Sequence, residues 1–130
     1  MELTIDDLAE KADLVVLGEV VSIAYQRDTE TGSIYTLVTF SVRQTFKGES
    51  LPELIIRIPG GSLDGEIQQV EDAPRFAQGE SAIIFLENGD AIFRVVGSFQ
   101  GKFTVYNDSM VGSIPLQEFI TQVNNAIAAQ

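Results

Sequence analysis

The residues with the clearest chemical potential lie between positions 73 and 76, where Pro74 precedes Arg75 and Phe76 follows it. Proline restricts the backbone, and a planar guanidinium held in one orientation can bind a carboxylate through two parallel hydrogen bonds. Arginine and large aromatic side chains also contribute disproportionately to the energy of protein interfaces. We therefore interpret Pro74, Arg75 and Phe76 as a partner-binding segment. The alternative is a structural role, with Phe76 filling one end of the fold and Arg75 paired to a nearby carboxylate.

Three further residues belong to the same hypothesis. Gly60 and Gly61 follow Pro59 and permit a sharply bent backbone, which we expect to join the 73–76 segment at one end of the fold. Lys102 is an isolated basic residue in a short apolar stretch. We include Gly60, Gly61 and Lys102 in the candidate binding site. The alternatives are a bent, mobile turn at the glycines and an outward-facing strand position for Lys102.

The composition excludes several kinds of catalysis. The 130 residues contain no cysteine and no histidine, so disulfides, thiolate nucleophiles, Cys/His zinc sites and Ser-His-Asp catalysis are ruled out. Nineteen acidic residues make paired-carboxylate catalysis arithmetically possible, but no pair stands out from the others. We expect no catalytic residue, no metal and no cofactor, and we interpret the protein as a non-enzyme.

The charge balance restricts the partners. Eight basic residues stand against nineteen acidic ones, and the net charge of −11 repels nucleic acid and anionic lipid over most of the surface. We therefore expect no nucleic acid as a partner. No apolar run is long enough to cross a bilayer, so we expect no membrane insertion. The first residues show neither the basic nor the apolar region of a secretory signal.

Alternation of apolar and polar residues predicts a mainly β chain. It is clearest at 34–46, where Val38, Phe40 and Val42 are expected inside the fold. On the opposite face of that strand we expect Thr39, Ser41 and Arg43 to be outside. Further strands are expected at 14–26 with a bend or bulge at Gly18, and at 54–58, 66–70, 81–86, 91–96 and 102–106.

Helices are expected at both ends of the chain. Thr4 can cap a short helix that reaches about Ala12. After Pro115, an apolar stripe predicts an amphipathic helix. The stripe consists of Leu116, Phe119, Ile120, Val123 and Ile127. We expect it to cover the strands, with docking onto a partner as the alternative.

These elements predict a single domain over residues 1–130. Five or six bent strands, one long loop between residues 60 and 79 and a terminal helix favour a small antiparallel, OB-like barrel. Closure into a barrel removes exposed strand edges, which otherwise invite aggregation. A β-sandwich is the alternative, because periodicity alone does not separate the two architectures.

Several short segments, taken in order, resemble an uncharacterised family of exported bacterial proteins. The segments are ADLVVLGEVV (12–21), IYT (34–36), FKG (46–48), PGG (59–61), APRF (73–76), GE (79–80), FRVVG (93–97) and QGKF (100–103). The resemblance covers roughly residues 3–127. It implies an extracytoplasmic or secreted bacterial protein without an established activity.

The resemblance also suggests a class of partner. Some members of that family are encoded near, or fused to, matrixin-like zinc peptidases, and the chain is similar in general appearance to the OB-fold part of tissue metalloproteinase inhibitors. Those inhibitors bind the protease zinc through an N-terminal cysteine, which this chain lacks, so that mechanism does not transfer. A second departure is Asp72, which stands before the 73–76 segment where a small residue is expected.

The residues and the resemblance together lead to one main hypothesis. The chain is interpreted as a non-enzymatic, extracytoplasmic binding module for a protein partner, with a peptidase as the partner class that the resemblance implies. The alternatives are a carboxylate-based enzyme, a carbohydrate-binding domain, and a structural domain of a longer chain.

Overall fold

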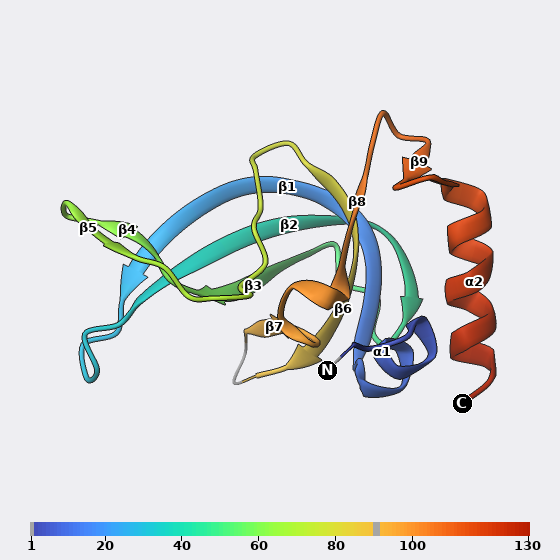
Figure 1. Ribbon diagram of the computed structural model, residues 1–130, viewed down its shortest axis with the longest axis horizontal. Helices are drawn as coiled ribbons and strands as arrows, with labels where there is room; N and C mark the ends of the chain where they lie inside the picture. The colour runs from blue at the N-terminus through green and yellow to red at the C-terminus, as the bar shows by residue number, and fades with distance from the viewer. Residues whose placement is uncertain (1, 90–91) are drawn as a thin grey trace.

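The protein is described here by a computed structural model that covers residues 2–89 and 92–130. It contains two α-helices, one 3-10 helix and ten short or long strands within the described residues (Figure 1). The elements are α1 (Ile5–Lys11), β1 (Leu14–Arg27), β2 (Ile34–Lys47), β3 (Glu53–Pro59), β4 (Gly61–Leu63), β5 (Glu66–Gln68), β6 (Ser81–Asn88), β7 (Phe93–Val95), η1 (Ser98–Gly101), β8 (Lys102–Val105), β9 (Met110–Val111), β10 (Ile114–Pro115) and α2 (Leu116–Ala128).

Five strands close into a barrel. The hydrogen-bonded order is β1-β2-β3-β7-β6, and β6 pairs with β1 again to complete the ring. This closure confirms the OB-like barrel and excludes the sandwich. One pairing differs from the expected antiparallel pattern, because β3 and β7 run parallel and meet at Ile56 and Phe93. β8 pairs with β6 beside β7 as an additional strand.

The interior of the barrel is filled by aliphatic side chains and one phenylalanine. The buried residues of this interior cluster are Leu14, Val16, Val20, Val38, Phe40, Leu54, Ile56, Ile58, Ala82, Ile84, Leu86 and Val95. Val38 and Phe40 are fully buried and Val42 packs against the same cluster. On the opposite face Ser41 and Arg43 are exposed and Thr39 is half-buried. The predicted orientation of β2 is therefore confirmed.

Strand β1 bends where the sequence predicts it. Its pairing with β2 shifts register between Leu17 and Gly18 and again after Val20. A Cβ atom at Gly18 would lie 2.1 Å from the carbonyl oxygen of Ser41, so only glycine allows β2 to approach this closely. The bulges let one long strand wrap around the barrel and pair with β2 on one side and β6 on the other.

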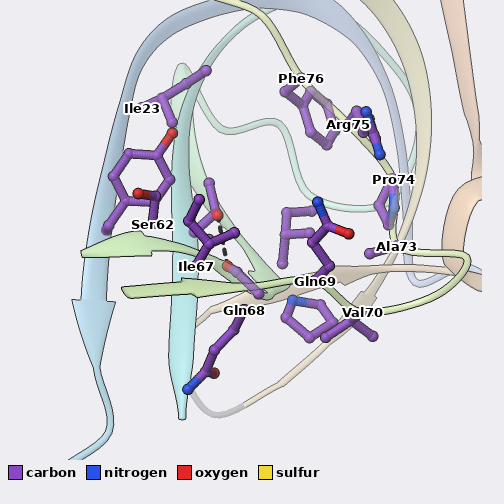
Figure 2. Close-up of a pocket in the computed structure, with 16 residues that line it drawn as sticks. Ile23, Ser62, Ile67, Gln68, Gln69, Val70, Ala73, Pro74, Arg75 and Phe76 are labelled. Carbon is purple, nitrogen blue, oxygen red and sulfur yellow. Dashed lines mark hydrogen bonds between the residues drawn. The ribbon is translucent and has the colours of Figure 1, made fainter. Parts of the chain in front are cut away.

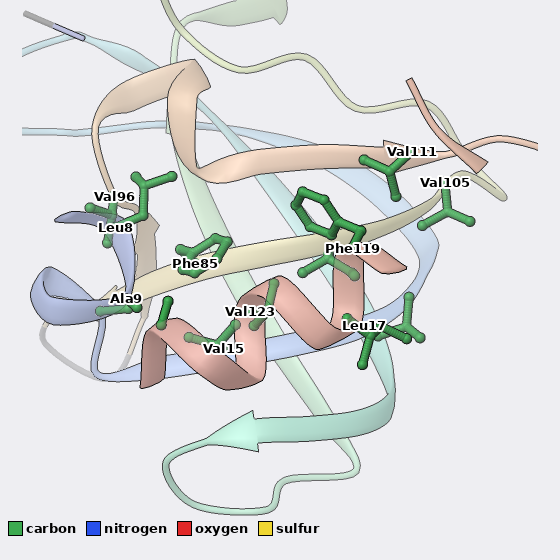
Figure 3. Close-up of a cluster of buried hydrophobic side chains, with 14 residues drawn as sticks. Leu8, Ala9, Val15, Leu17, Phe85, Val96, Val105, Val111, Phe119 and Val123 are labelled. Atoms are coloured by element: carbon green, nitrogen blue, oxygen red, sulfur yellow. The ribbon is translucent and has the colours of Figure 1, made fainter. Parts of the chain in front are cut away.

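The two helices cover one outer wall of the barrel. Figure 3 shows Phe119 and Val123 of α2 facing Val15 of β1 and Phe85 of β6. Strand β6 and the first part of β1 (Leu14–Gly18) are therefore buried on both faces, which explains why residues 82–86 are all apolar. The expectation that the C-terminal helix covers the strands is confirmed. Pro115 lies one position before the first helical residue.

Helix α1 begins as expected. The hydroxyl of Thr4 accepts a hydrogen bond from the Asp7 backbone N–H, and the Asp7 carboxylate accepts one from the Thr4 N–H. This reciprocal capping box satisfies two N–H groups at the helix start. It also holds the pKa of Asp7 below its ordinary value, through the Thr4 backbone hydrogen bond and then the Thr4 hydroxyl. Leu8 and Ala9 are buried beneath α2.

The segment between residues 60 and 79 differs from the expected long loop. Its first part forms the hairpin of β4 and β5, which projects at one end of the long axis in Figure 1. The strand expected at 66–70 ends at Gln68. The strand expected at 91–96 is shorter as well, and its Ala91 lies outside the described residues. Residues 96–101 then loop out of the barrel wall before β8 resumes the pairing with β6.

None of the helices within residues 2–89 and 92–130 combines the length and the apolar character needed to cross a membrane.

Candidate functional site

A cavity of about 380 Å³ lies between the β4–β5 hairpin and the 73–76 segment; we call it the hairpin groove. Figure 2 shows Ser62 and Ile67 of the hairpin on one side, and Pro74, Arg75 and Phe76 on the other. The groove is lined by Ile23, Tyr25, Thr36, Ile58, Pro59, Gly60, Gly61, Ser62, Ile67, Gln68, Gln69, Val70, Ala73, Pro74, Arg75 and Phe76. The structure thus brings together five of the six predicted site residues, all except Lys102.

The two glycines place the hairpin against the barrel. The backbone N–H of Gly60 donates to the carbonyl of Ile34 at 2.9 Å, and its carbonyl accepts from the Thr36 hydroxyl at 2.8 Å. At Gly61 the backbone φ is +146°, and a Cβ atom there would lie 2.8 Å from the Tyr25 ring. Glycine is required at this position because the hairpin leaves the barrel in direct contact with β1 and β2.

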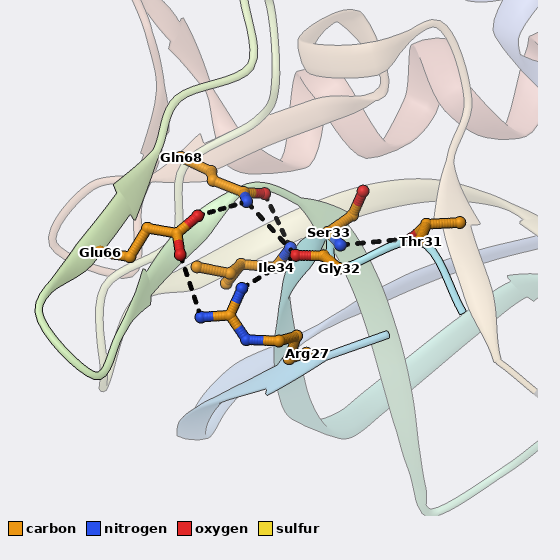
Figure 4. A network of polar contacts seen from close by, with 7 residues as sticks. All are labelled: Arg27, Thr31, Gly32, Ser33, Ile34, Glu66 and Gln68. Carbon is orange, nitrogen blue, oxygen red and sulfur yellow. Dashed lines mark hydrogen bonds and ion pairs between the residues drawn. The ribbon is translucent and has the colours of Figure 1, made fainter. Parts of the chain in front are cut away.

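A polar network fixes the hairpin to the turn between β1 and β2 (Figure 4). Arg27 donates to the Gly32 carbonyl at 2.9 Å and pairs with Glu66 at 3.2 Å. The Gln68 amide donates to Glu66 and accepts from the backbone N–H of Ile34. Hydrogen bonds from Gln68 and then Arg27 hold the pKa of Glu66 below its ordinary value. The network orients the wall of the groove that carries Ile67.

Some side chains of the 73–76 segment are buried and others are exposed to solvent. Pro74 is buried, and Phe76 is partly buried against the interior cluster of the barrel. Arg75 is exposed, and its guanidinium has no hydrogen bond or ion pair within the described part of the chain. The structure therefore does not show the alternative pairing of Arg75 with Glu71, Asp72 or Glu80. It does show Phe76 packed against the barrel interior.

Lys102 supports the segment from behind and does not line the groove. Its ammonium group lies 2.8 Å from a carboxylate oxygen of Glu80 and 4.5 Å from the centre of the Phe76 ring. It also donates a hydrogen bond to the Arg75 carbonyl oxygen. The side chains of Lys102 and Glu80 are only 11% and 15% exposed. Lys102 is therefore neither an isolated basic site nor a fully outward-facing strand residue.

Glu80 completes this support, which we call the lysine latch (Lys102, Glu80, Thr104 and Phe76). Its carboxylate accepts hydrogen bonds from the Thr104 hydroxyl at 2.6 Å and from the Ala77 backbone N–H at 3.0 Å. Partial burial raises the pKa of Glu80, but the hydrogen bonds from Lys102, Thr104 and Ala77 outweigh it and leave the pKa below its ordinary value. The latch holds the segment that presents Arg75.

The groove also contains exposed apolar side chains that sequence reasoning missed. Tyr25, Ile67 and Val70 all line it, and Ile67 is 69% exposed. Tyr25 lies at the end of a long bent strand and Ile67 lies in a mostly polar stretch, so neither has an apolar pattern around it. These side chains come to line one groove only after β4 and β5 pair. Together they give the groove apolar walls around one cation.

The acidic residues do not form a metal site within residues 2–89 and 92–130. No three carboxylates there are close enough together to hold an ion. Among the described residues that line the hairpin groove, none is acidic, and Arg75 is the one charged side chain.

Comparison with models of known protein families gives no match for this chain, and neither does comparison with curated protein sequences.

Proposed function

We propose that this protein is a non-enzymatic, extracytoplasmic module that binds a protein partner through the hairpin groove. The observation that carries the proposal is the unpaired guanidinium of Arg75 in a groove that is also lined by the exposed side chains of Tyr25, Ile67 and Val70. Apolar anchors and an arginine beside them are the residues from which protein interfaces obtain most of their energy.

The charge of the molecule specifies the partner further. The protein as a whole carries −11, so a strongly acidic protein is repelled over most of its surface. Within the groove the only charge among the described lining residues is positive. A segment with one carboxylate between apolar side chains fits both conditions, since the carboxylate can pair with Arg75 while the rest of the partner is neutral or basic.

The hairpin groove is better suited to recognition than to catalysis. None of the described residues lining it is a carboxylate, a histidine or a cysteine, so it offers no general acid or base of those types. The size of the cavity, about 380 Å³, suits a few side chains of a bound segment.

The resemblance to exported bacterial proteins supports an extracytoplasmic location, and it supports a matrixin-like zinc peptidase as the partner class. Because the chain has no cysteine, we propose that such a peptidase is contacted through the groove and not through its zinc. The proposal is tested first by selecting random displayed peptides on the immobilised protein. We expect the enriched peptides to combine an acidic residue with bulky apolar neighbours.

The affinity of a selected peptide then tests the role of Arg75. Substitution Arg75→Ala is expected to weaken binding at least about tenfold, or ~1.4 kcal/mol. The matched control is Arg43→Ala, which removes an exposed arginine that pairs with Glu19 on the outer face of β1 and β2. Peptides without acidic residues, or equal losses in both variants, would contradict the proposal.

A further inference from the structure

The pairing of the arginines is uneven. Arg27 pairs with Glu66 and Arg43 with Glu19, whereas the guanidinium groups of Arg57, Arg75 and Arg94 have no hydrogen bond or ion pair within the part of the chain that the structure describes. In a protein with nineteen acidic residues, an exposed arginine has many possible partners. Arg75 belongs to the hairpin groove. The other two lie together elsewhere, on the outer face of β3 and β7.

Arg57 and Arg94 are neighbours across the one parallel junction of the barrel. Ile56 of β3 pairs with Phe93 of β7, so the next residues of the two strands, Arg57 and Arg94, lie side by side on the outer face. Neighbouring strands are about 4.8 Å apart, so the backbones of the two arginines are close enough for their long side chains to converge on one small anion. Both arginines line two adjoining cavities, of about 420 Å³ and 340 Å³.

Tyr35 orients one of these arginines. The guanidinium of Arg57 lies 4.6 Å from the centre of the Tyr35 ring, within the range of a cation–π contact. This contact restricts the arginine while leaving the hydrogen-bonding edge of its guanidinium available. The Arg57 guanidinium also covers one face of the Tyr35 ring, which is the one aromatic ring among the described residues lining the larger cavity. A sugar or a nucleobase would need such a face for stacking.

The remaining walls favour a peptide. Pro59, Val70 and Pro74 give the larger cavity an apolar side, whereas Glu71 and Glu87 lie on its lining as well. Two acidic and two basic residues leave that lining without a net charge, so a dense polyanion gains little there. A single carboxylate can still form paired hydrogen bonds with the two guanidiniums, and an apolar neighbour can contact the prolines.

We propose that Arg57 and Arg94 form a second binding site, which takes the carboxylate of an acidic side chain in a peptide segment. This site does not depend on the hairpin groove, since Arg75 does not line either of its cavities. The stretch 70–74 separates the two sites, because Val70, Ala73 and Pro74 line a cavity on each side of it.

The test uses two blocked tetrapeptides, Val-Glu-Val-Ala and Val-Gln-Val-Ala, in titrations followed by amide NMR at low salt. We expect the glutamate peptide to shift the amides of Tyr35, Arg57 and Arg94, and to bind at least about fivefold more tightly than the glutamine peptide. The double substitution Arg57→Gln with Arg94→Gln should abolish this preference. Arg43→Gln and Arg75→Gln should each leave it unchanged, which separates this site from the groove.

Several results would overturn the second site. They are equal binding of the two peptides, no detectable binding at about 5 mM peptide, or loss of the preference in Arg43→Gln. Tighter binding of polygalacturonate through the same two arginines would assign the site to an acidic saccharide instead. Displacement of the glutamate peptide by inorganic phosphate at a similar concentration would indicate a general anion site and would also contradict the proposal.

Discussion

Within the 73–76 segment, the adjacent side chains of Arg75 and Phe76 point in opposite directions. Phe76 turns toward the barrel and lies beneath Lys102, while Arg75 extends into solvent. The residue types of this segment could be identified from the sequence as suited to binding. The lysine latch could not be identified from the sequence, because Lys102 and Glu80 come from separate parts of the chain and meet only after β8 pairs with β6.

The ion pair of the latch should contribute measurably to stability. Substitution Lys102→Met removes the charge and leaves Glu80 largely buried without its ammonium partner. The free-energy contribution of such a largely buried pair is expected between that of exposed pairs, about 0–1 kcal/mol, and that of fully buried ones, about 3–5 kcal/mol. We expect a loss of roughly 1–3 kcal/mol in urea unfolding. In the control Arg43→Met, whose ion pair is about half exposed, the loss should stay within about 0.5 kcal/mol.

Equal effects of Lys102→Met and Arg43→Met would show that the latch is no stronger than a surface pair. Amide shifts confined to residues 74–77 in Lys102→Met would locate the loosening in the segment that carries Arg75.

The depressed pKa of Glu80 predicts how stability depends on pH. In the unfolded chain the carboxyl has its ordinary pKa of about 4.3, so between that value and the lower folded pKa the unfolded state binds more protons. Stability from Glu80 is therefore complete above about pH 5 and is lost as the pH falls through the folded pKa. We expect the stability difference between wild type and Glu80→Gln to be constant near neutral pH and to shrink below about pH 4.

Urea unfolding of both proteins across this range provides the measurement. Taking the difference removes the parallel contributions of Asp7 and Glu66, whose pKa values are also lowered. A difference that grew on acidification would mean that the carboxyl is stabilised in its protonated form.

At the scale of elements, long periodic patterns of apolar residues allowed a strand or helix to be predicted from the sequence, whereas pairings between very short strands could not be predicted. The strand at 34–46 could be predicted with its inward face, and the stripe of α2 with its buried side, because each pattern extends over several turns or pairs. The hairpin of β4 and β5 has three residues in each strand and depends on Arg27, Glu66 and Gln68 for its position. Contacts of that kind leave no periodic signal.

The burial of β6 and of the first part of β1 on both faces shows a second limit of prediction from the sequence. A strand was predicted at 81–86, and β6 pairs there with three other strands. The sequence alone did not show that one face lines the barrel while the other lies under α2. That assignment requires the position of Phe119 and Val123 over Phe85.

The inward face of β2 gives a direct test of the barrel. Phe40 is fully buried in the interior cluster, so Phe40→Ala should cost about 3–5 kcal/mol of unfolding free energy. The matched control is Phe99→Ala in η1, where the residue is 53% exposed and the expected change is within about 0.5 kcal/mol. Chemical denaturation of both variants provides the comparison, and similar losses would contradict the assignment of the interior.

At the scale of the whole molecule, the helices that cover the barrel and the proposed binding groove lie in different regions. The helices cover one outer wall, whereas the β4–β5 hairpin projects at the other end of the long axis (Figure 1). The chain contains nineteen acidic residues, whereas the described lining of the groove carries a single positive charge. Under the proposed function, this distribution repels acidic proteins in general, and the groove is a place where a carboxylate is accepted.

The central claim is that binding takes place in the hairpin groove, and mapping a selected peptide on the labelled protein by amide NMR tests it most directly. We expect the shifts to concentrate at Tyr25, Gly61, Ile67, Arg75 and Phe76. In Arg75→Ala, which should unfold within about 0.5 kcal/mol of wild type, binding should weaken at least about tenfold. Shifts confined to another surface, or full affinity in a folded Arg75→Ala protein, would contradict the account.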